Sequence, residues 1–145
     1  MRVKEGEPGS QYVRNFRDLR VYKEARALAK DIFEISKAFP ADERYSLTSQ
    51  IRRSSRSIGA QIAESWAKRL YKAHFISKLT DSDGEQYETQ HWLEIAFDCE
   101  RLDKAQRDKL VAKCTDIGKM LNGMISKAEY FCQSSVKESL SGYEF

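Results

Sequence analysis

The chain has 145 residues, of which 32% are charged and 41% are hydrophobic, with two prolines and seven glycines. This composition predicts a single soluble domain and argues against a β-sandwich, which needs more turn residues. The formal net charge of +3 is too small to indicate nucleic-acid binding by itself.

The first predicted element is a helix that starts near residue 18. Residues 1–15 are polar and predict a flexible arm, so the folded domain is expected over residues 16–132. Asp18 can cap the helix, which should end before Pro40 because the residue preceding a proline is pushed out of the α region. Its apolar face recurs at spacings of three and four: Tyr22, Ala25, Leu28, Ala29, Ile32, Ile35 and Phe39.

A loop over residues 40–46 is expected to lead to a second helix capped by Ser46 or Thr48. Ser55, Gly59 and Ala63 lie four apart, so another helix could approach them closely. Gly59 costs about 1 kcal/mol of helix propensity relative to alanine, which suggests a packing reason, although a merely tolerated glycine is an equal alternative. The apolar face has near-heptad spacing: Leu47, Ile51, Ser55, Ile58, Ile62 and Trp66.

A third helix is expected from about 70 to 101. Its predicted inner face is Ala73, Ile76, Leu79, Asp83, Gln86, Tyr87, Gln90, Leu93 and Phe97. The polar residues in the middle of this face could be hydrogen-bonded inside a bundle or partly exposed. We favour partial exposure, because an unpartnered buried polar group costs a few kcal/mol.

The fourth predicted helix follows a short link near Asp103. It carries a heptad pattern: Leu110, Cys114, Ile117, Leu121, Met124, Ala128 and Phe131. Residues 133–145 lose this period and predict a flexible tail. Four amphipathic segments with short connections predict an all-α fold, an antiparallel up-and-down four-helix bundle.

Charge is distributed unevenly along the chain. Residues 44–72 contain seven basic residues and one acid, whereas residues 81–103 contain eight acids and one arginine. A basic and an acidic region are expected when subunits attract each other or when a polyanion binds one side. The candidate phosphate contacts are Arg52, Arg53, Arg56, Lys68, Arg69 and Lys72.

No pattern in the sequence predicts an enzyme, a metal site or a cofactor. Glu88 and His91 have the E-x-x-H spacing of di-iron bundles, but such sites need a second such motif and further carboxylates. The acids between 81 and 88 diverge on a helix and do not converge on one Mg²⁺ ion.

The cysteines and the hydropathy indicate a cytoplasmic location. Cys99, Cys114 and Cys132 are odd in number and lack a C-x-x-C spacing, so reduced, mostly buried thiols are expected. No stretch approaches the roughly 18 to 20 apolar residues that cross a bilayer, and no secretory signal is readable at the start. We expect no membrane partner and no small-molecule substrate.

The segment QIRRSSRSIGAQIAE, over residues 50–64, with Phe39-Pro40 and Tyr45 before it, resembles the family of four-helix-bundle proteins encoded within intervening sequences of bacterial 23S rRNA genes. That family is related to the accessory variability proteins of diversity-generating retroelements. Gly59, Gln61 and Ser65 depart from the family pattern, which usually has proline, asparagine and glycine there. The resemblance implies a ring-like homo-oligomer, pentameric in family members, with a basic surface for nucleic acid and no established catalysis.

Two functions remain open from the sequence. The first is a non-catalytic oligomeric scaffold that binds RNA or DNA through the six basic residues, with little sequence selectivity. The second is a structural or protein-interaction module, in which the basic and acidic regions only build the homo-oligomer. Tyr45, Trp66, Tyr71 and Trp92 could stack on bases, but aromatic residues at helical spacing more often belong to a core or an interface.

Overall fold

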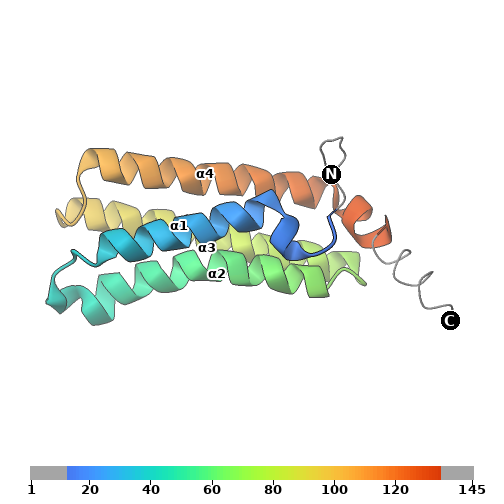
Figure 1. Ribbon diagram of the computed structural model, residues 1–145, viewed down its shortest axis with the longest axis horizontal. Coiled ribbons are helices and arrows are strands. Elements are labelled where there is room, and N and C mark those ends of the chain that lie inside the picture. The colour runs from blue at the N-terminus through green and yellow to red at the C-terminus, as the bar shows by residue number, and fades with distance from the viewer. Residues whose placement is uncertain (1–12, 135–145) are drawn as a thin grey trace.

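The computed structural model describes residues 13–134, and the regular structure in this part of the chain is entirely helical, which confirms the all-α class. Four long helices lie side by side along the long axis (Figure 1): α1 (Arg20–Ser36), α2 (Ser49–Ala67), α3 (Lys72–Asp98) and α4 (Lys104–Ser126). Shorter helical turns flank them: η1 (Phe16–Asp18), η2 (Ala41–Glu43), η3 (Arg44–Thr48) and η4 (Tyr130–Ser134). Most of the predicted arm and tail, residues 1–12 and 135–145, lies outside the described residues.

Helices that are consecutive in the chain pack against each other, and the last long helix also packs against the first. α2 packs between α1 and α3, and α4 packs against α3 and α1. Arg53, early in α2, pairs with Glu88, late in α3. Glu64, late in α2, pairs with Lys78, early in α3, with 2.8 Å between Oε1 and Nζ. The order of contacts along α2 is therefore the reverse of the order along α3.

A heptad-like core runs through all four helices. Buried residues alternate at spacings of three and four, which places them on one face of each helix. The residues predicted for the inner faces of the first, second and fourth helices supply most of this core. The large apolar side chains that are fully buried are Leu28, Ile32, Ile51, Ile58, Ile62, Phe75, Leu79, Leu93, Ile117 and Leu121. Each contributes about 1.5–3 kcal/mol relative to an exposed position.

The inner face predicted for the third helix is partly wrong. Ala73 is exposed, and the buried residues are Phe75, Leu79, Ser82, Gln86, Thr89, Leu93 and Ala96. Gln86 is only 2% exposed. Its Nε2 donates to Asp83 Oδ1 at 2.9 Å, and its Oε1 accepts from Gln90 Nε2 at 2.8 Å. Because these bonds replace water, the amide can be buried, and the expectation of partial exposure fails for Gln86.

The predicted helix caps are also wrong. The Asp18 carboxylate accepts from the backbone N–H groups of Arg14 and Asn15, and Asn15 caps η1. Asp18 therefore closes the turn that precedes α1. Residues 41–48 are helical turns rather than a loop. Thr48 already has αR geometry and makes no side-chain cap, and the Ser46 hydroxyl donates to Glu43 instead.

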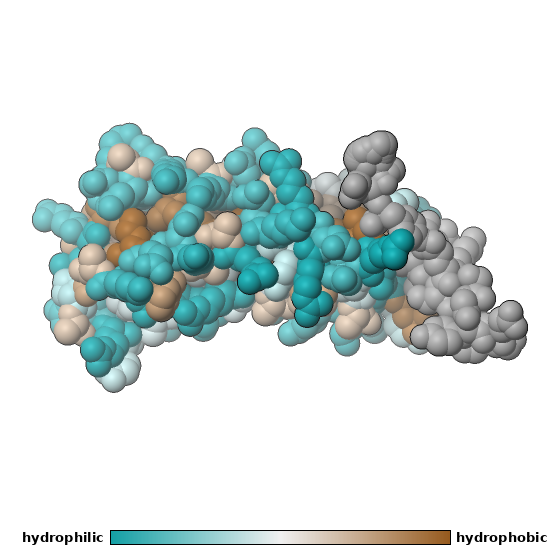
Figure 2. Space-filling view, in the orientation of Figure 1, coloured by the Kyte–Doolittle hydropathy of each residue, from teal (hydrophilic) through white to brown (hydrophobic). Residues whose placement is uncertain are grey.

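The exterior of the bundle is mainly polar. The face seen in Figure 2 is hydrophilic over most of its length, with hydrophobic areas between α1 and α4. Among the described residues, no helix combines the length and the apolar character that crossing a bilayer requires.

The three cysteines are free, as expected. Cys114 and Cys132 are buried, while Cys99 is exposed just after α3. Burial raises the pKa of the Cys114 thiol to about 12, because the thiolate would lose its hydration. The thiols therefore differ sharply in their access to reagents.

Candidate nucleic-acid interface

The six basic residues predicted to contact phosphate lie in two groups near the two ends of α2. One group is Arg52, Arg53 and Arg56, and the other is Lys68, Arg69 and Lys72. Twelve residues separate Arg56 from Lys68, which corresponds to about 18 Å along a helix that rises 1.5 Å per residue. The structure therefore does not bring the six together into one patch.

The first group surrounds a shallow groove of about 550 Å³ where η3 runs into α2. We call it the arginine groove, and its lining consists of Arg44, Thr48, Ser49, Arg52, Arg53, Arg56, Ser57 and Ala60. Arg44 was not among the predicted contacts, because the turn that places it beside α2 has no clear sequence signal. The Thr48 hydroxyl is buried and has no hydrogen-bond partner among the described residues, so it retains an unused donor.

Two of these arginines are positioned by one aromatic ring of α1. The guanidinium of Arg52 lies 4.7 Å from the centroid of the Phe33 ring, and that of Arg56 lies 5.5 Å from it. Arg52 Nε also donates to Ser36 Oγ at 2.7 Å. The ring attracts both cations through its quadrupole and limits their motion. Phe33 and Ser36 therefore support the groove, although neither residue was predicted to belong to a site.

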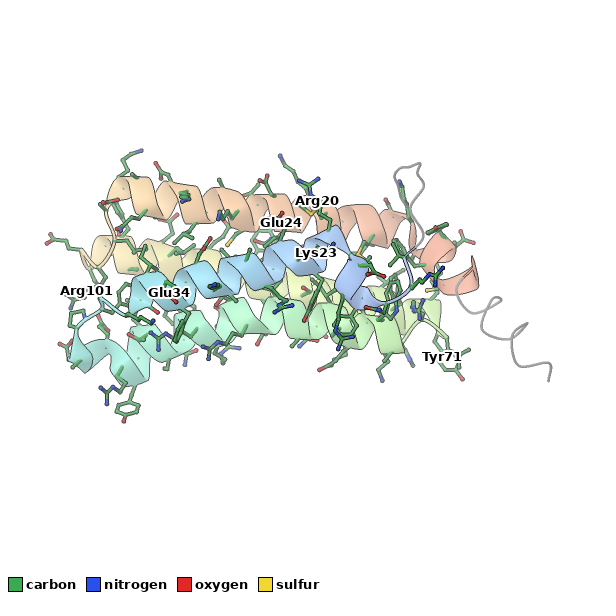
Figure 3. The ribbon with its side chains drawn as sticks, viewed as in Figure 1. Arg20, Lys23, Glu24, Glu34, Tyr71 and Arg101 are labelled. Atoms are coloured by element: carbon green, nitrogen blue, oxygen red, sulfur yellow. The ribbon has the colours of Figure 1, made fainter. Side chains whose placement is uncertain are left out.

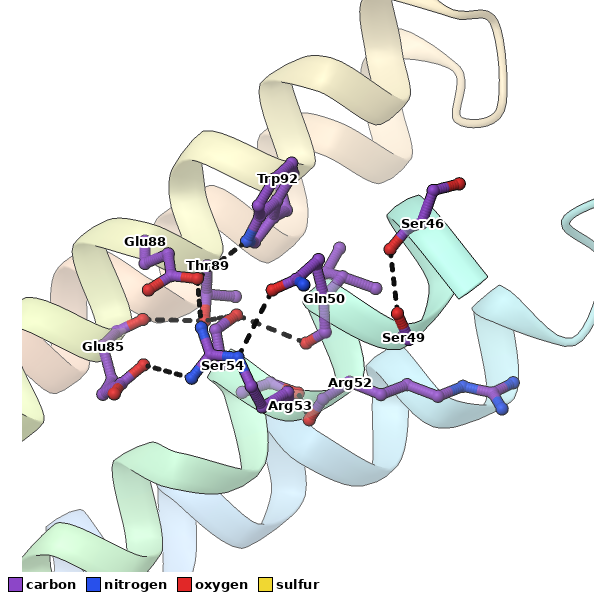
Figure 4. Close-up of polar contacts among 12 residues, drawn as sticks. Ser46, Ser49, Gln50, Arg52, Arg53, Ser54, Glu85, Glu88, Thr89 and Trp92 are labelled. Atoms are coloured by element: carbon purple, nitrogen blue, oxygen red, sulfur yellow. Dashed lines mark hydrogen bonds and ion pairs between the residues drawn. The ribbon is translucent and has the colours of Figure 1, made fainter. Parts of the chain in front are cut away.

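Arg53 is already occupied by α3. Its guanidinium pairs with Glu88 and with Glu85, at 3.4 Å from Glu85 Oε1, and its Nε donates to Gln50 Oε1 at 3.3 Å. Figure 4 shows Arg53 directed toward these carboxylates and Arg52 extended in another direction. Hydrogen bonding to Glu88 raises the pKa of Arg53. Its charge is thus largely compensated within the chain.

Glu88 is held by a second donor as well. The indole N–H of Trp92 donates to Glu88 Oε2 at 3.0 Å. This bond and the one from Arg53 lower the pKa of Glu88, because both stabilise the carboxylate. Glu88 therefore remains charged at neutral pH and continues to hold Arg53.

The second basic group makes different contacts. Arg69 stacks 3.8 Å from the centroid of the Trp66 ring and donates from Nε to Trp66 O at 2.9 Å. Burial lowers the pKa of Arg69. Lys72 Nζ lies 3.7 Å from Glu129 Oε1, and Lys68 is exposed. Arg69 thus packs against the bundle, whereas Lys68 and Lys72 are exposed.

Several acids of α3 pair within the chain. Besides Glu85 and Glu88, Asp81 lies 3.9 Å from Lys78, and Glu94 accepts from Arg107 at 2.5 Å. These contacts reduce the acidic surface available to a neighbouring subunit.

The E-x-x-H pair points to packing rather than to metal binding. Glu88 is engaged by Arg53 and Trp92, and the His91 ring lies against Trp92 with 4.8 Å between centroids. Within residues 13–134, no group of three or more His, Cys, Asp or Glu side chains could hold a metal ion.

Together these features define a helical protein with a positively charged groove. The family model for the 23S rRNA-intervening sequence protein matches residues 17–123, and the chain belongs to this family. A solved structure of a protein of unknown function from the S23 ribosomal protein family of Bacteroides thetaiotaomicron VPI-5482 is similar, with a TM-score of 0.66 and 29% identity. The similarity covers 73% of this chain and 95% of that chain. Comparison with curated proteins gives no match.

The three departures from the family pattern have local contacts in the fold. A Cβ on Gly59 would lie 3.6 Å from Tyr22 Cε1, which is an ordinary contact, so the packing there does not require glycine. Gln61 Oε1 accepts from Lys78 Nζ at 3.3 Å. Ser65 is fully buried and donates to Ile62 O at 2.6 Å. None of the three lines the arginine groove.

Proposed function

We propose that the chain is a non-catalytic, oligomeric scaffold, an antiparallel up-and-down four-helix bundle that binds RNA or DNA through the arginine groove. The observation that carries this proposal is the exposure of Arg44 and Arg56 on the groove, where neither pairs with a carboxylate among the described residues. Guanidinium groups stay charged at physiological pH and bind phosphate oxygens through two parallel hydrogen bonds.

The basic residues are proposed to differ in how directly they contact phosphate. Arg44 and Arg56 supply the charges that are free to meet phosphate. Arg52 and Arg53 already bind protein groups, so they contribute mainly to the local potential. Lys68 and Lys72, near the other end of α2, would contact only a ligand long enough to span about 18 Å. Phosphate contacts carry no sequence information, so we expect little sequence selectivity.

The test compares two variants with the same change in net charge. Arg44→Ala/Arg56→Ala removes the free groove charges and keeps the contacts of Arg52 and Arg53. Lys109→Ala/Lys119→Ala removes two exposed lysines of α4, a helix that packs against α1 and α3.

Binding of a labelled oligonucleotide is measured by fluorescence anisotropy across salt concentrations. Wild type should lose affinity steeply as salt rises. The plot of log K against log[salt] has a negative slope, and loss of two phosphate contacts should reduce its magnitude by about 1.4 to 1.8. The α4 variant should keep the wild-type slope. Binding that is absent, or independent of salt, would contradict the proposal.

Self-association is the second part of the proposal. Leu70, Tyr71 and Tyr87 are each more than 60% exposed, and burial of such side chains between subunits would stabilise an oligomer. The family resemblance suggests a pentamer in the cytoplasm and a relation to retroelement accessory proteins. Light scattering tests the subunit number. If Arg44→Ala/Arg56→Ala breaks the oligomer and wild type binds no nucleic acid, the groove is an assembly surface instead.

A further inference from the structure

We infer that the arginine groove takes single-stranded nucleic acid, with an unpaired base stacked on Tyr45, the adjacent phosphate against Arg44 and a phosphate further along the strand against Arg56. This inference rests on the proposed function and narrows its ligand. It begins from Tyr45, whose side chain is 87% exposed and is the most exposed of the large hydrophobic residues described. A single exposed aromatic residue is common on protein surfaces. Tyr45 therefore indicates a base-stacking site only through its position relative to the groove.

Tyr45 lies in the helical run that builds the groove. It belongs to η3, directly follows Arg44, and precedes Ser49 by four residues; both of these line the groove. Residues separated by three or four positions share one face of an α-helix, so Ser49, Arg52 and Arg56 form one row on α2, and Tyr45 lies in the π-helical turn directly before this row. At about 1.5 Å per residue, Tyr45 and Arg56 are about 16 Å apart along the chain, which matches roughly five stacked nucleotides at 3.4 Å each.

The other aromatic candidates lack this combination of exposure and position. Trp66 is buried, and the Trp92 indole N–H is used by Glu88. Tyr71 is 61% exposed, but Figure 3 shows it at the opposite end of the bundle from Arg101. Arg101 marks the η3 end, because its Nε lies 3.2 Å from Glu43 Oε2, one residue before η3. Of these four aromatic residues, Tyr45 is therefore the one that directly adjoins a groove-lining residue, Arg44, in the chain.

The chemistry of the row favours an unpaired strand over a duplex. In a duplex the base faces are covered by their neighbours, so a tyrosine ring cannot reach them, whereas in a single strand every base offers a face. The cations are also held in place beforehand, because Phe33 orients the guanidinium groups of Arg52 and Arg56.

The experiment uses the full chain and labelled 12-nucleotide strands without self-complementarity, as RNA and as DNA, alone and annealed to their complements. Tyr45→Ala is compared with Tyr45→Phe, which keeps the ring, and with Tyr130→Ala, which removes an exposed tyrosine from η4. Anisotropy gives each affinity, and light scattering gives the mass of each variant.

Wild type should bind the single strands more tightly than the duplexes. Tyr45→Ala should weaken single-strand binding by about 5- to 150-fold and leave duplex binding unchanged. Tyr45→Phe and Tyr130→Ala should bind like wild type.

The inference is overturned if Tyr45→Ala keeps the wild-type affinity for single strands, or if it changes the oligomeric mass. Equal affinity for strands and duplexes that still depends on Arg44 and Arg56 would overturn this inference and leave the proposed function standing. Absence of salt-dependent binding to every oligonucleotide would overturn both.

Discussion

Gly118 of α4 offers a sharp test of the buried polar cluster in the bundle. A Cβ added at this position would lie 2.9 Å from Gln86 Nε2 and 3.3 Å from Asp83 Oδ1. The first of these separations is shorter than normal contact. Gln86 is nearly fully buried and bonded to Asp83 and Gln90, so it has no free space into which to move. Gly118→Ala must therefore displace the buried amide or separate α3 from α4.

Three contributions determine the change in the free energy of unfolding, of which one is stabilising and two are destabilising. Alanine gains about 1 kcal/mol of helix propensity over glycine. Overpacking of a filled core costs about 1–3 kcal/mol. Displacement of the Gln86 amide loses about 1 kcal/mol for each hydrogen bond that is broken. With about 2 kcal/mol for overpacking and one hydrogen bond broken, we therefore expect Gly118→Ala to lower the free energy of unfolding by about 2 kcal/mol.

Gly123 provides the matched control on the same helix. A Cβ there would meet no atom within 4 Å, so Gly123→Ala should raise the free energy of unfolding by about 1 kcal/mol. Urea unfolding is followed by circular dichroism at one protein concentration. In the double variant Gln86→Ala/Gly118→Ala the added penalty should disappear, which gives a coupling energy for the pair. If Gly118→Ala stabilises the protein as much as Gly123→Ala, our account of the packed amide is refuted.

Two further predictions concern titratable side chains. Glu88→Gln should cost about 1 kcal/mol of stability or less at pH 7, because the pair with Arg53 is substantially exposed, and it should tighten oligonucleotide binding more than Asp116→Asn on α4 does. Since the pKa of Glu88 is lowered by folding, its contribution is full above about pH 4.5 and is lost as the pH falls through the lowered value; a stability difference between wild type and Glu88→Gln that does not shrink as the pH falls below about 4.5 would contradict this. With iodoacetamide at pH 8, Cys99 should react quickly and Cys114 only after unfolding, which peptide mass spectrometry would show; rapid labelling of Cys114 in the folded protein would be inconsistent with its burial.

The four long helices could be predicted from the sequence because apolar residues recur in it at helical spacing. Ile51, Ile58 and Ile62 recur at heptad spacing, and all three are fully buried in α2. The same logic held only in part in α3, where Leu79, Gln86 and Leu93 are buried on the predicted inner face but the polar Ser82 occupies a core position that was not predicted. A polar residue can be buried when it finds a partner, and the partner of Ser82 is the Ile58 carbonyl, 24 residues away in sequence and 2.8 Å away in space. No local pattern contains that information.

The basic site was predicted in part. Its residue types and the segment around Arg52 and Arg56 followed from charge counting. Arg44 was missed as a contact because it lies in a π-helical turn that the sequence indicated as a loop. Lys68, Arg69 and Lys72 were grouped with the three arginines because the two groups are close in sequence. A straight helix nevertheless keeps the two groups about 18 Å apart.

The sequence by itself determined the all-α class, the inner faces of α1, α2 and α4, and the surplus of positive charge in residues 44–72, because each depends on residue types at local spacing. Only the tertiary structure decided which of those charges stay free. Arg53 is neutralised by carboxylates 32 and 35 residues further along the chain, and Arg52 is bound by Ser36 of α1. Arg44 and Arg56 remain exposed on the arginine groove, since packing between helices fixes which side chains meet a partner and which face water.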